Sequence, residues 1–257
     1  MQLSKDFTAY HTIVRKEVTR FLRIWTQTLI PPVITQSLYF LIFGKFIGSQ
    51  IPDIQGVSYM SFIVPGLVMM SIINNAYANV SGSFFSSKFQ RSVEELLVSP
   101  TPNWVMIAGY VTGGMLRGII VGILVFVVSV FFTKPMISHF FVIAVFMVLT
   151  SLLFALGGFL NGILARGFDD IGIFPMFVLT PLTYLGGVFY SLNSLPEVWR
   201  DISYFNPILY LVNGFRYGFY GFADVSLLAS LSILVFFVIV LIVVNLEILK
   251  RGIGLKN

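Results

Sequence analysis

The sequence predicts an all-α polytopic membrane protein with six transmembrane helices, and its composition and apolar runs carry that prediction. Of 257 residues, 57% are hydrophobic and only 11% are charged, whereas soluble domains have about 45–50% apolar and 25% charged residues. A chain with 27 Phe is also far from the composition of disordered segments. The placement of the basic residues then gives the expected orientation.

Six apolar runs approach the length of about 20 residues that an α-helix needs to cross a bilayer. They cover residues 29–46, 59–84, 113–132, 140–164, 171–190 and 227–246. None alternates as the strands of a transmembrane β-barrel do. The first run is not expected to be a signal peptide, because the segment before it is long and contains Asp6 and Glu17.

Six spans place both termini on one side of the membrane, together with eleven of the sixteen basic residues. These are Lys5, Arg15, Lys16, Arg20, Arg23, Lys88, Arg91, Arg166, Lys250, Arg251 and Lys256. The other side holds Lys45, Lys134, Arg200 and Arg216. The positive-inside rule then predicts a cytoplasmic N-terminus with an interfacial helix at 1–28, a six-span domain at 29–249 and a cytoplasmic tail at 250–257.

The N-terminal segment has the pattern of an amphipathic helix. Its apolar positions recur at spacings of three and four, and they are Phe7, Tyr10, Val14, Val18, Phe21, Leu22 and Trp25. The opposite face carries Arg15, Lys16, Thr19, Arg20 and Arg23. A basic amphipathic helix of this kind favours the inner membrane interface. We expect an anchor there, or an elbow that also touches a cytosolic partner.

The loop at 85–102 predicts a short cytoplasmic helix of about fourteen residues, which is too short to cross the bilayer. One face holds Phe85, Phe89, Val93, Leu96 and Leu97. The other holds Lys88, Arg91, Glu94 and Glu95, with Arg91 and Glu95 spaced for an i,i+4 ion pair. Pro100 should end the helix by moving Ser99 out of the helical region. The segment is either a solvated connector or a docking helix.

Few polar residues interrupt the spans. Ser71, Asn75, Asn79 and Ser83 form one stripe on the second span, which either lines a path for substrate or hydrogen-bonds to other helices. Small-residue ridges at Gly114, Gly118 and Gly122 and at Gly158 and Gly162 predict close helix packing. Arg117, four or five residues inside the third run, is expected to extend back to the cytoplasmic interface.

The fifth run should be bent or broken, because it contains Pro175, Pro181, Gly186 and Gly187. The following stretch, 191–224, mixes apolar and polar residues and includes Pro196 and Pro207. Neither a clean span nor a soluble loop has this pattern. We expect re-entrant half-helices that dip into the outer leaflet and cover a cavity, since irregular backbone at that depth must be satisfied by protein.

Several functions are disfavoured by what the sequence lacks. It has no Cys and only two His, His11 and His139, which rules out thiolate sites and leaves no evident metal centre or acid–base pair for a membrane enzyme. No Gly-x-x-x-x-Gly-Lys-Ser/Thr loop occurs, so the chain has no such site for a nucleotide phosphate. Membrane topology accounts for the net charge of +5 without nucleic-acid binding.

Three passages carry a resemblance to a known family. They are residues 62–67 (Phe-Ile-Val-Pro-Gly-Leu), residues 94–100 (Glu-Glu-Leu-Leu-Val-Ser-Pro), and residues 181–190 followed by Leu195-Pro196, Asn206-Pro207 and Arg216. With six spans and the N-terminal helix, the chain resembles the ATP-binding-cassette exporter permeases of the second type over essentially its whole length. It departs from them at Arg91-Ser92, where Thr-Gly often precedes the acidic pair.

The resemblance implies a half-transporter of the bacterial inner membrane that works as a homodimer with two copies of a separate cytosolic ABC ATPase. ATP and Mg would bind to that partner, and this chain would hold no cofactor, metal or catalytic residue. The coupling residues would be Phe89, Arg91, Val93, Glu94, Glu95, Leu96, Leu97 and Pro100. The outer gate or broken helix would include Pro181, Gly186, Gly187 and Pro207. The substrate would be a drug, lipid or glycan. A passive channel or ion-coupled secondary carrier is the alternative, and transport without any ATPase would favour it.

Overall fold

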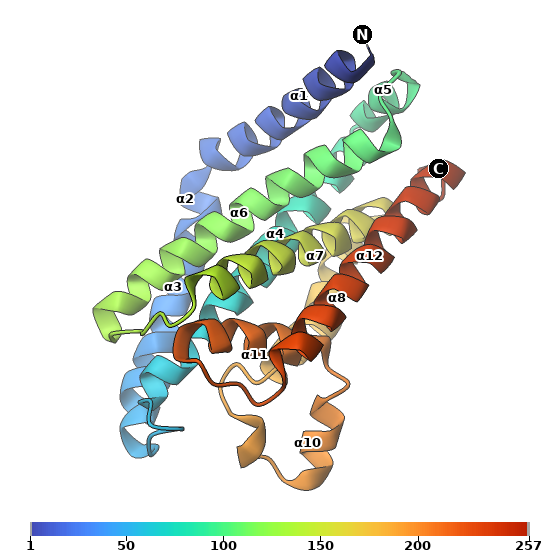
Figure 1. Cartoon of the computed structure of the whole chain (residues 1–257). Coiled ribbons are helices and arrows are strands. Elements are labelled where there is room, and N and C mark those ends of the chain that lie inside the picture. Colours follow the sequence, from blue (N-terminus) through green and yellow to red (C-terminus); the bar gives the residue numbers. More distant parts are fainter. Residues whose placement is uncertain (1, 256–257) are drawn as a thin grey trace.

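The computed structural model describes residues 2–255, and the regular elements of this part are helices, apart from one isolated bridge between Ile54 and Val57 (Figure 1). In chain order they are α1 (Gln2–Arg23), α2 (Trp25–Thr28), α3 (Ile30–Tyr39), the π-helix η1 (Phe40–Ile47), the 3-10 helix η2 (Gly48–Gln50), α4 (Tyr59–Phe89), α5 (Ser92–Val98), α6 (Asn103–Phe132), α7 (Phe140–Leu164), α8 (Phe168–Phe174), the π-helix η3 (Pro175–Leu179), α9 (Thr180–Tyr184), the 3-10 helix η4 (Leu192–Ser194), α10 (Glu197–Ser203), α11 (Pro207–Tyr220) and α12 (Leu227–Arg251). The predicted all-helical class is therefore confirmed.

Five helical stretches in the described residues are long and apolar enough to cross a membrane. They are Trp25–Gln50, α4, α6, α7 and α12. The remaining predicted span forms α8, η3 and α9, an unbroken helical path of 17 residues, or about 26 Å at 1.5 Å per residue. Five candidate spans are thus observed, and the sixth crossing stays a prediction.

Helix α4 is the centre of the molecule and is buried along most of its length. It packs against α6 and α7, while α1 lies beside α6 and α12 beside α7 (Figure 1). The glycine ridges form the contacts with α4. A β-carbon at Gly118 would lie 2.9 Å from Cβ of Ala76, and one at Gly122 would lie 2.6 Å from Cγ1 of Ile72. The expected close packing therefore occurs within one chain, around α4.

The two ends of the molecule differ in structure. Figure 1 places α5 and both termini at one end, and α10 with its flanking loops at the other. Lys256, one of the basic residues used for the orientation, lies outside the described residues. Any motion that passes between the two ends has to cross the packed middle of α4, α6 and α7.

The neighbouring glycines of α7 give a matched test of this packing. A β-carbon at Gly158 would overlap the backbone oxygen of Tyr77, whereas one at Gly157 would come no closer than 3.8 Å to the Tyr77 ring and 4.0 Å to Leu241. Gly158→Ala should therefore lower the free energy of unfolding by about 1–3 kcal/mol through overpacking. Gly157→Ala should leave it unchanged or raised, since Ala favours helix. Denaturant titration in detergent micelles measures both, and equal losses would contradict the packing described.

Candidate functional site

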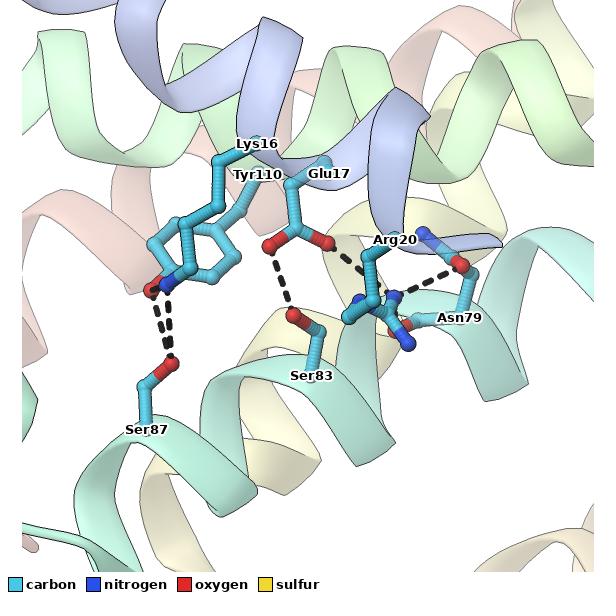
Figure 2. A network of polar contacts seen from close by, with 7 residues as sticks. All are labelled: Lys16, Glu17, Arg20, Asn79, Ser83, Ser87 and Tyr110. Atoms are coloured by element: carbon cyan, nitrogen blue, oxygen red, sulfur yellow. Dashed lines mark hydrogen bonds and ion pairs between the residues drawn. The ribbon is translucent and has the colours of Figure 1, made fainter. Parts of the chain in front are cut away.

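A buried carboxylate joins α1 to α4. The side chain of Glu17 is fully buried. Its Oε1 accepts a hydrogen bond from Oγ of Ser83 at 2.6 Å, and its Oε2 lies 3.1 Å from Nη2 of Arg20 (Figure 2). Gly113 of α6 makes room for it, because a β-carbon there would overlap Cβ of Glu17. A buried charge is tolerated when it is paired and hydrogen-bonded in this way.

Two basic side chains of α1, Arg20 and Lys16, also extend to α4. Nη2 of Arg20 donates to Oδ1 of Asn79 at 2.8 Å and to the Asn79 backbone oxygen at 3.2 Å. One turn earlier, Nζ of Lys16 lies 3.2 Å from Oγ of Ser87 and 3.4 Å from the hydroxyl of Tyr110 on α6 (Figure 2). We call Lys16, Glu17, Arg20, Asn79, Ser83, Ser87 and Tyr110 the α1–α4 polar cluster.

The position predicted for Arg117 is wrong. Helix α6 begins at Asn103, so Arg117 lies fourteen residues inside it rather than four or five. Its Nη2 donates to Oδ1 of Asn75 at 3.2 Å and to the backbone oxygen of Thr28 at 3.3 Å. Residues 104–111 are mostly apolar and belong to the same helix, so the predicted run began too late. Arg117 therefore bonds to neighbouring helices instead of extending to the interface.

The polar stripe on α4 contacts other helices at three of its four positions. Asn75 meets Arg117, Asn79 meets Arg20, and Ser83 meets Glu17. Ser71 bonds only within its own helix, to the backbone oxygen of Leu67. These contacts are the hydrogen bonding expected between packed helices. A role of the stripe in a substrate path stays a prediction.

The sequence analysis missed Glu17 as a site residue. Ile13, Glu17 and Phe21 follow one another at four-residue spacing and all three are buried, with Ile13 and Glu17 against Gly109 and Gly113 of α6. An acidic residue between two apolar ones on the buried face, three positions before an arginine, is a signal that could have found it.

The predicted fourteen-residue helix at 85–102 is wrong in its extent. Helix α4 continues to Phe89, the chain turns at Arg91 in the left-handed region (φ 60°), and α5 has only seven residues. Arg91 precedes α5, so the expected pair with Glu95 is not among the ion pairs of the described residues. The end of the helix is as predicted, with Ser99 extended before Pro100.

The turn and α5 expose some predicted coupling residues and bury others. Val93 is only 2% exposed and Phe85 is also buried, so neither is free to seat in a partner. Phe89 is 65% exposed and Val98, which the sequence analysis omitted, is 87% exposed. We define the α5 surface as Phe89, Arg91, Glu94, Glu95, Leu97 and Val98, all of which are exposed.

A groove of about 650 Å³ adjoins the α5 surface. Phe89 packs edge-on against Phe168 at 5.0 Å between ring centroids, and Arg91 and Arg166 also line the groove. Nζ of Lys88 donates to the backbone oxygens of Ile163 and Ala165, each at 2.7 Å, and so joins the end of α4 to the end of α7. These contacts hold the end of α4, from which the α5 surface extends, against the end of α7.

At the other end, the helix of the fifth run continues through Pro175 and Pro181, contrary to the prediction, and breaks at Gly186 and Gly187. Helix α9 ends at Tyr184, and Gly187 has a φ of 73° that side-chain-bearing residues rarely adopt. Arg216, almost fully buried, donates from Nη2 to the Gly187 backbone oxygen at 2.6 Å and lies 3.9 Å over the ring of Phe62. The turn is therefore fixed by a cation from α11 that itself packs on α4.

The rest of the outer segment is satisfied by side chains. Asn206 caps α11 through the backbone N–H of Ile208 and donates to the Leu182 backbone oxygen at 2.7 Å. The carboxylate of Asp224 accepts from Oγ of Ser191 at 2.9 Å and from the N–H of Leu192 at 3.0 Å. The segment contains the short helices α10 and α11, and their position as re-entrant half-helices in the outer leaflet stays a prediction. Side chains thus replace the missing helical hydrogen bonds.

Comparisons with known proteins cover most of the chain. Residues 8–220 match the family model described as ABC-2 type transporter. The inner membrane transport permease YadH of Escherichia coli K12 is 55% identical over 251 residues, 98% of each chain. Nodulation protein J of Rhizobium leguminosarum bv. viciae is 24% identical over 219 residues, 83% of each chain. Nodulation protein J of Neorhizobium galegae is 21% identical over 242 residues, 92% of this chain and 91% of its own length.

The α1–α4 polar cluster predicts a large effect of removing its carboxylate. Glu17→Ala leaves Ser83 without this acceptor and leaves Arg20 with its Asn79 acceptors alone, so the free energy of unfolding should fall by about 1–3 kcal/mol. The double variant Glu17→Ala with Arg20→Ala should lose less than the sum of the single losses. Denaturant titration in detergent micelles measures each value.

The exposed pair between Glu247 and Arg251, 2.6 Å apart, is the matched control. Glu247→Ala should leave the free energy of unfolding nearly unchanged, because exposed ion pairs contribute little. A Glu17→Ala variant as stable as Glu247→Ala would show that the buried cluster does not hold α1 in place.

Proposed function

Since the chain belongs to the ABC-2 type transporter family, we propose that it is the transmembrane permease subunit of an ATP-driven exporter. The observation that carries the proposal is the family match over residues 8–220, in a chain whose sequence has no Gly-x-x-x-x-Gly-Lys-Ser/Thr loop. If transport is driven by ATP, its energy would then come from another chain. A separate ATPase would bind ATP and Mg, and this chain would carry the substrate out of the cytoplasm or the inner leaflet.

The proposed assembly has two copies of this chain and two ATPase subunits in a bacterial inner membrane. Similarity to an inner membrane permease and the apolar helices support the location. Both termini and α5 would face the cytoplasm, and α8 to α9 would make the sixth crossing. The excess of basic residues on that side supports this orientation.

The α5 surface is the proposed contact with the ATPase. Phe89, Leu97 and Val98 would seat in an apolar groove of the partner, with Glu94 and Glu95 at its rim. Val93 would instead hold α5 on its own chain. Closure of the ATPase dimer would move α5 and, through the turn at Arg91, the end of α4. This shifts the permease between states only if the contact differs between them.

The outer segment is the proposed gate on the far side. Pro181, Gly186, Gly187 and Pro207 shape its breaks, and Arg216 fixes the turn after α9. The stripe from Ser71 to Ser83 is the proposed path, which would become accessible when α4 moves relative to α1. Alternating access then consists of movement of α4 between these two ends.

An ion-coupled secondary carrier is the second candidate. The buried Glu17 favours it, because ionisable residues within a membrane protein often mark ion pathways. Both oxygens of that carboxylate already hold partners on α1 and α4. Transport by the purified permease in vesicles, driven by an ion gradient without any ATPase, would establish this candidate instead of the exporter.

The first prediction from the proposal concerns the apolar anchor of the α5 surface. Phe89→Ala should weaken association with the ATPase by about tenfold, because buried apolar anchors dominate interfaces. Glu94→Ala with Glu95→Ala should weaken it less and lower the stimulation of ATP hydrolysis. Co-purification and hydrolysis rates in the reconstituted complex measure these effects.

The control for that experiment is Phe141→Ala, which removes an equally exposed Phe from the first turn of α7 at the far end of the molecule. It should leave association unchanged. If Phe89→Ala associates as well as Phe141→Ala does, α5 is only a connector.

A second prediction tests the orientation. The chain has no native Cys, so single Cys residues at positions 91, 199 and 200 can be labelled without background. In intact cells, a membrane-impermeant thiol reagent should label positions 199 and 200 but not position 91. Lysed cells should show labelling at all three. Labelling of position 91 from outside would overturn the proposed topology.

A further inference from the structure

An apolar pocket of about 400 Å³ lies between α4, α7, η3, α9, α11 and α12, away from the polar cluster and the α5 surface. Its volume is within the usual range for sites that hold a small molecule, about 300–1,000 Å³. Tyr77, Gly157, Asn161, Phe174, Leu182 and Leu241 are among its lining residues. One lining residue, Pro207, belongs to the proposed outer gate, but no function proposed above is assigned to the pocket itself.

Local backbone features keep the pocket open. Pro175 begins the π-helix η3, and such wider turns in a helix often occur at functional sites. On the opposite wall Gly157 has no side chain, and a β-carbon there would come no closer than 3.8 Å to Tyr77 and 4.0 Å to Leu241. The wall at Gly157 therefore has space that a larger residue could fill without a clash at its first atom.

One end of the pocket is polar. Tyr77 is 1% exposed, and its hydroxyl has no well-formed hydrogen bond among the described residues, although the amide of Asn161 is beside it. Asn161 itself donates from Nδ2 to the Ile171 backbone oxygen at 3.2 Å. A buried hydroxyl without a partner is unfavourable by about 1–3 kcal/mol. An oxygen atom of a bound molecule would satisfy it.

The mouth of the pocket is bordered by exposed apolar side chains. Phe174, which stacks on Tyr77 at 5.6 Å, is partly exposed, and Met176 and Phe177 beside it are more exposed still. Phe237 of α12, which also lines the pocket, is exposed on the other rim. In a membrane-embedded chain such a rim faces hydrocarbon. The occupant would therefore enter from the bilayer.

The polar end of the pocket is also near the edge of the bilayer. Asn161 lies one turn before the end of α7 at Leu164, on the same side as α5. From there the pocket follows α7 back to Leu153, a distance of about 12 Å at 1.5 Å per residue. An amphiphile with its oxygen at the edge and its chain toward the middle fits this arrangement.

We propose that this pocket binds one acyl chain of a phospholipid from the leaflet on the α5 side, with an ester oxygen of the lipid hydrogen-bonded to Tyr77 and Asn161. The acyl chain would lie along α7 between η3 and α12. The site is within one protomer and does not depend on the ATPase. It is therefore independent of the exporter proposal.

Photolabelling of the full chain in lipid nanodiscs tests this site. The probe is a phosphatidylcholine with a diazirine on one acyl chain, and labelled peptides are identified by mass spectrometry. The wild-type chain should be labelled in peptides from α7 and from α8 to α9. Gly157→Leu fills the pocket and should reduce that labelling by about tenfold, because the added side chain leaves no room for the acyl chain.

The matched control is Gly172→Leu, which adds the same side chain to an exposed position of α8 with nothing within 4 Å of its β-carbon. It should leave the labelling unchanged. Tyr77→Phe keeps the ring and removes the hydroxyl, so it should reduce the labelling by about fivefold, the value of one hydrogen bond. This second variant decides the question if Gly157→Leu does not fold.

Three outcomes would overturn the proposal. One is unchanged labelling in a folded Gly157→Leu variant or, if that variant does not fold, in Tyr77→Phe. Another is an equal loss in Gly172→Leu, which would mean that the label reports general lipid contact. The third is a crosslink between two chains from a photoreactive residue at position 174, which would assign the pocket to a second copy of the protein.

Discussion

The burial of α4 is the constraint on which the rest of the structure depends. A helix enclosed by other helices has no water for its polar side chains, so most of them are paired within the protein, and the Tyr77 hydroxyl is an exception. Glycines of α6 and α7 bring those helices close to its backbone. Glu17, Arg20 and Arg117 then supply partners for Ser83, Asn79 and Asn75. Helix α1 is therefore a structural part of the bundle, required by the stripe that it covers.

The sequence predicted the features that the bilayer and the backbone impose. Apolar runs of bilayer length located five candidate spans, and the glycine ridges predicted close contacts. Other features depend on tertiary contacts that no local pattern specifies. Glycine spacing indicates that a backbone comes close but does not say which helix it belongs to. The turn at Arg91 could not be predicted because a left-handed residue is usually Gly or Asn, and here the Lys88 contacts with α7 hold the end of α4.

Arg216, at the outer end, is another residue whose contacts could not be predicted from a local sequence pattern. By charge placement it is an ordinary basic residue of an outer loop, and its burial depends on two segments far away in the sequence. The ring of Phe62 and the oxygen of Gly187 surround its guanidinium. The predicted break in the fifth run was thus correct for Gly186 and Gly187 but not for Pro175 and Pro181, through which the helix continues. The residue that fixes the break could be identified only once α4, α9 and α11 were seen together.

Helix α4 meets both ends of the molecule through these contacts, as α6 and α7 also do. At one end it leads through the Arg91 turn into α5, and at the other Phe62 lies under Arg216 while the Ser61 backbone oxygen accepts from the Tyr220 hydroxyl at 2.6 Å. Its 31 residues extend for about 46 Å. A displacement applied at α5 therefore needs no long series of side-chain contacts to affect the outer segment, because a single packed helix connects the two. The α1–α4 polar cluster lies along the α5-side half of α4. Its hydrogen bonds would hold α4 in place while they are intact, and α4 could move once they break.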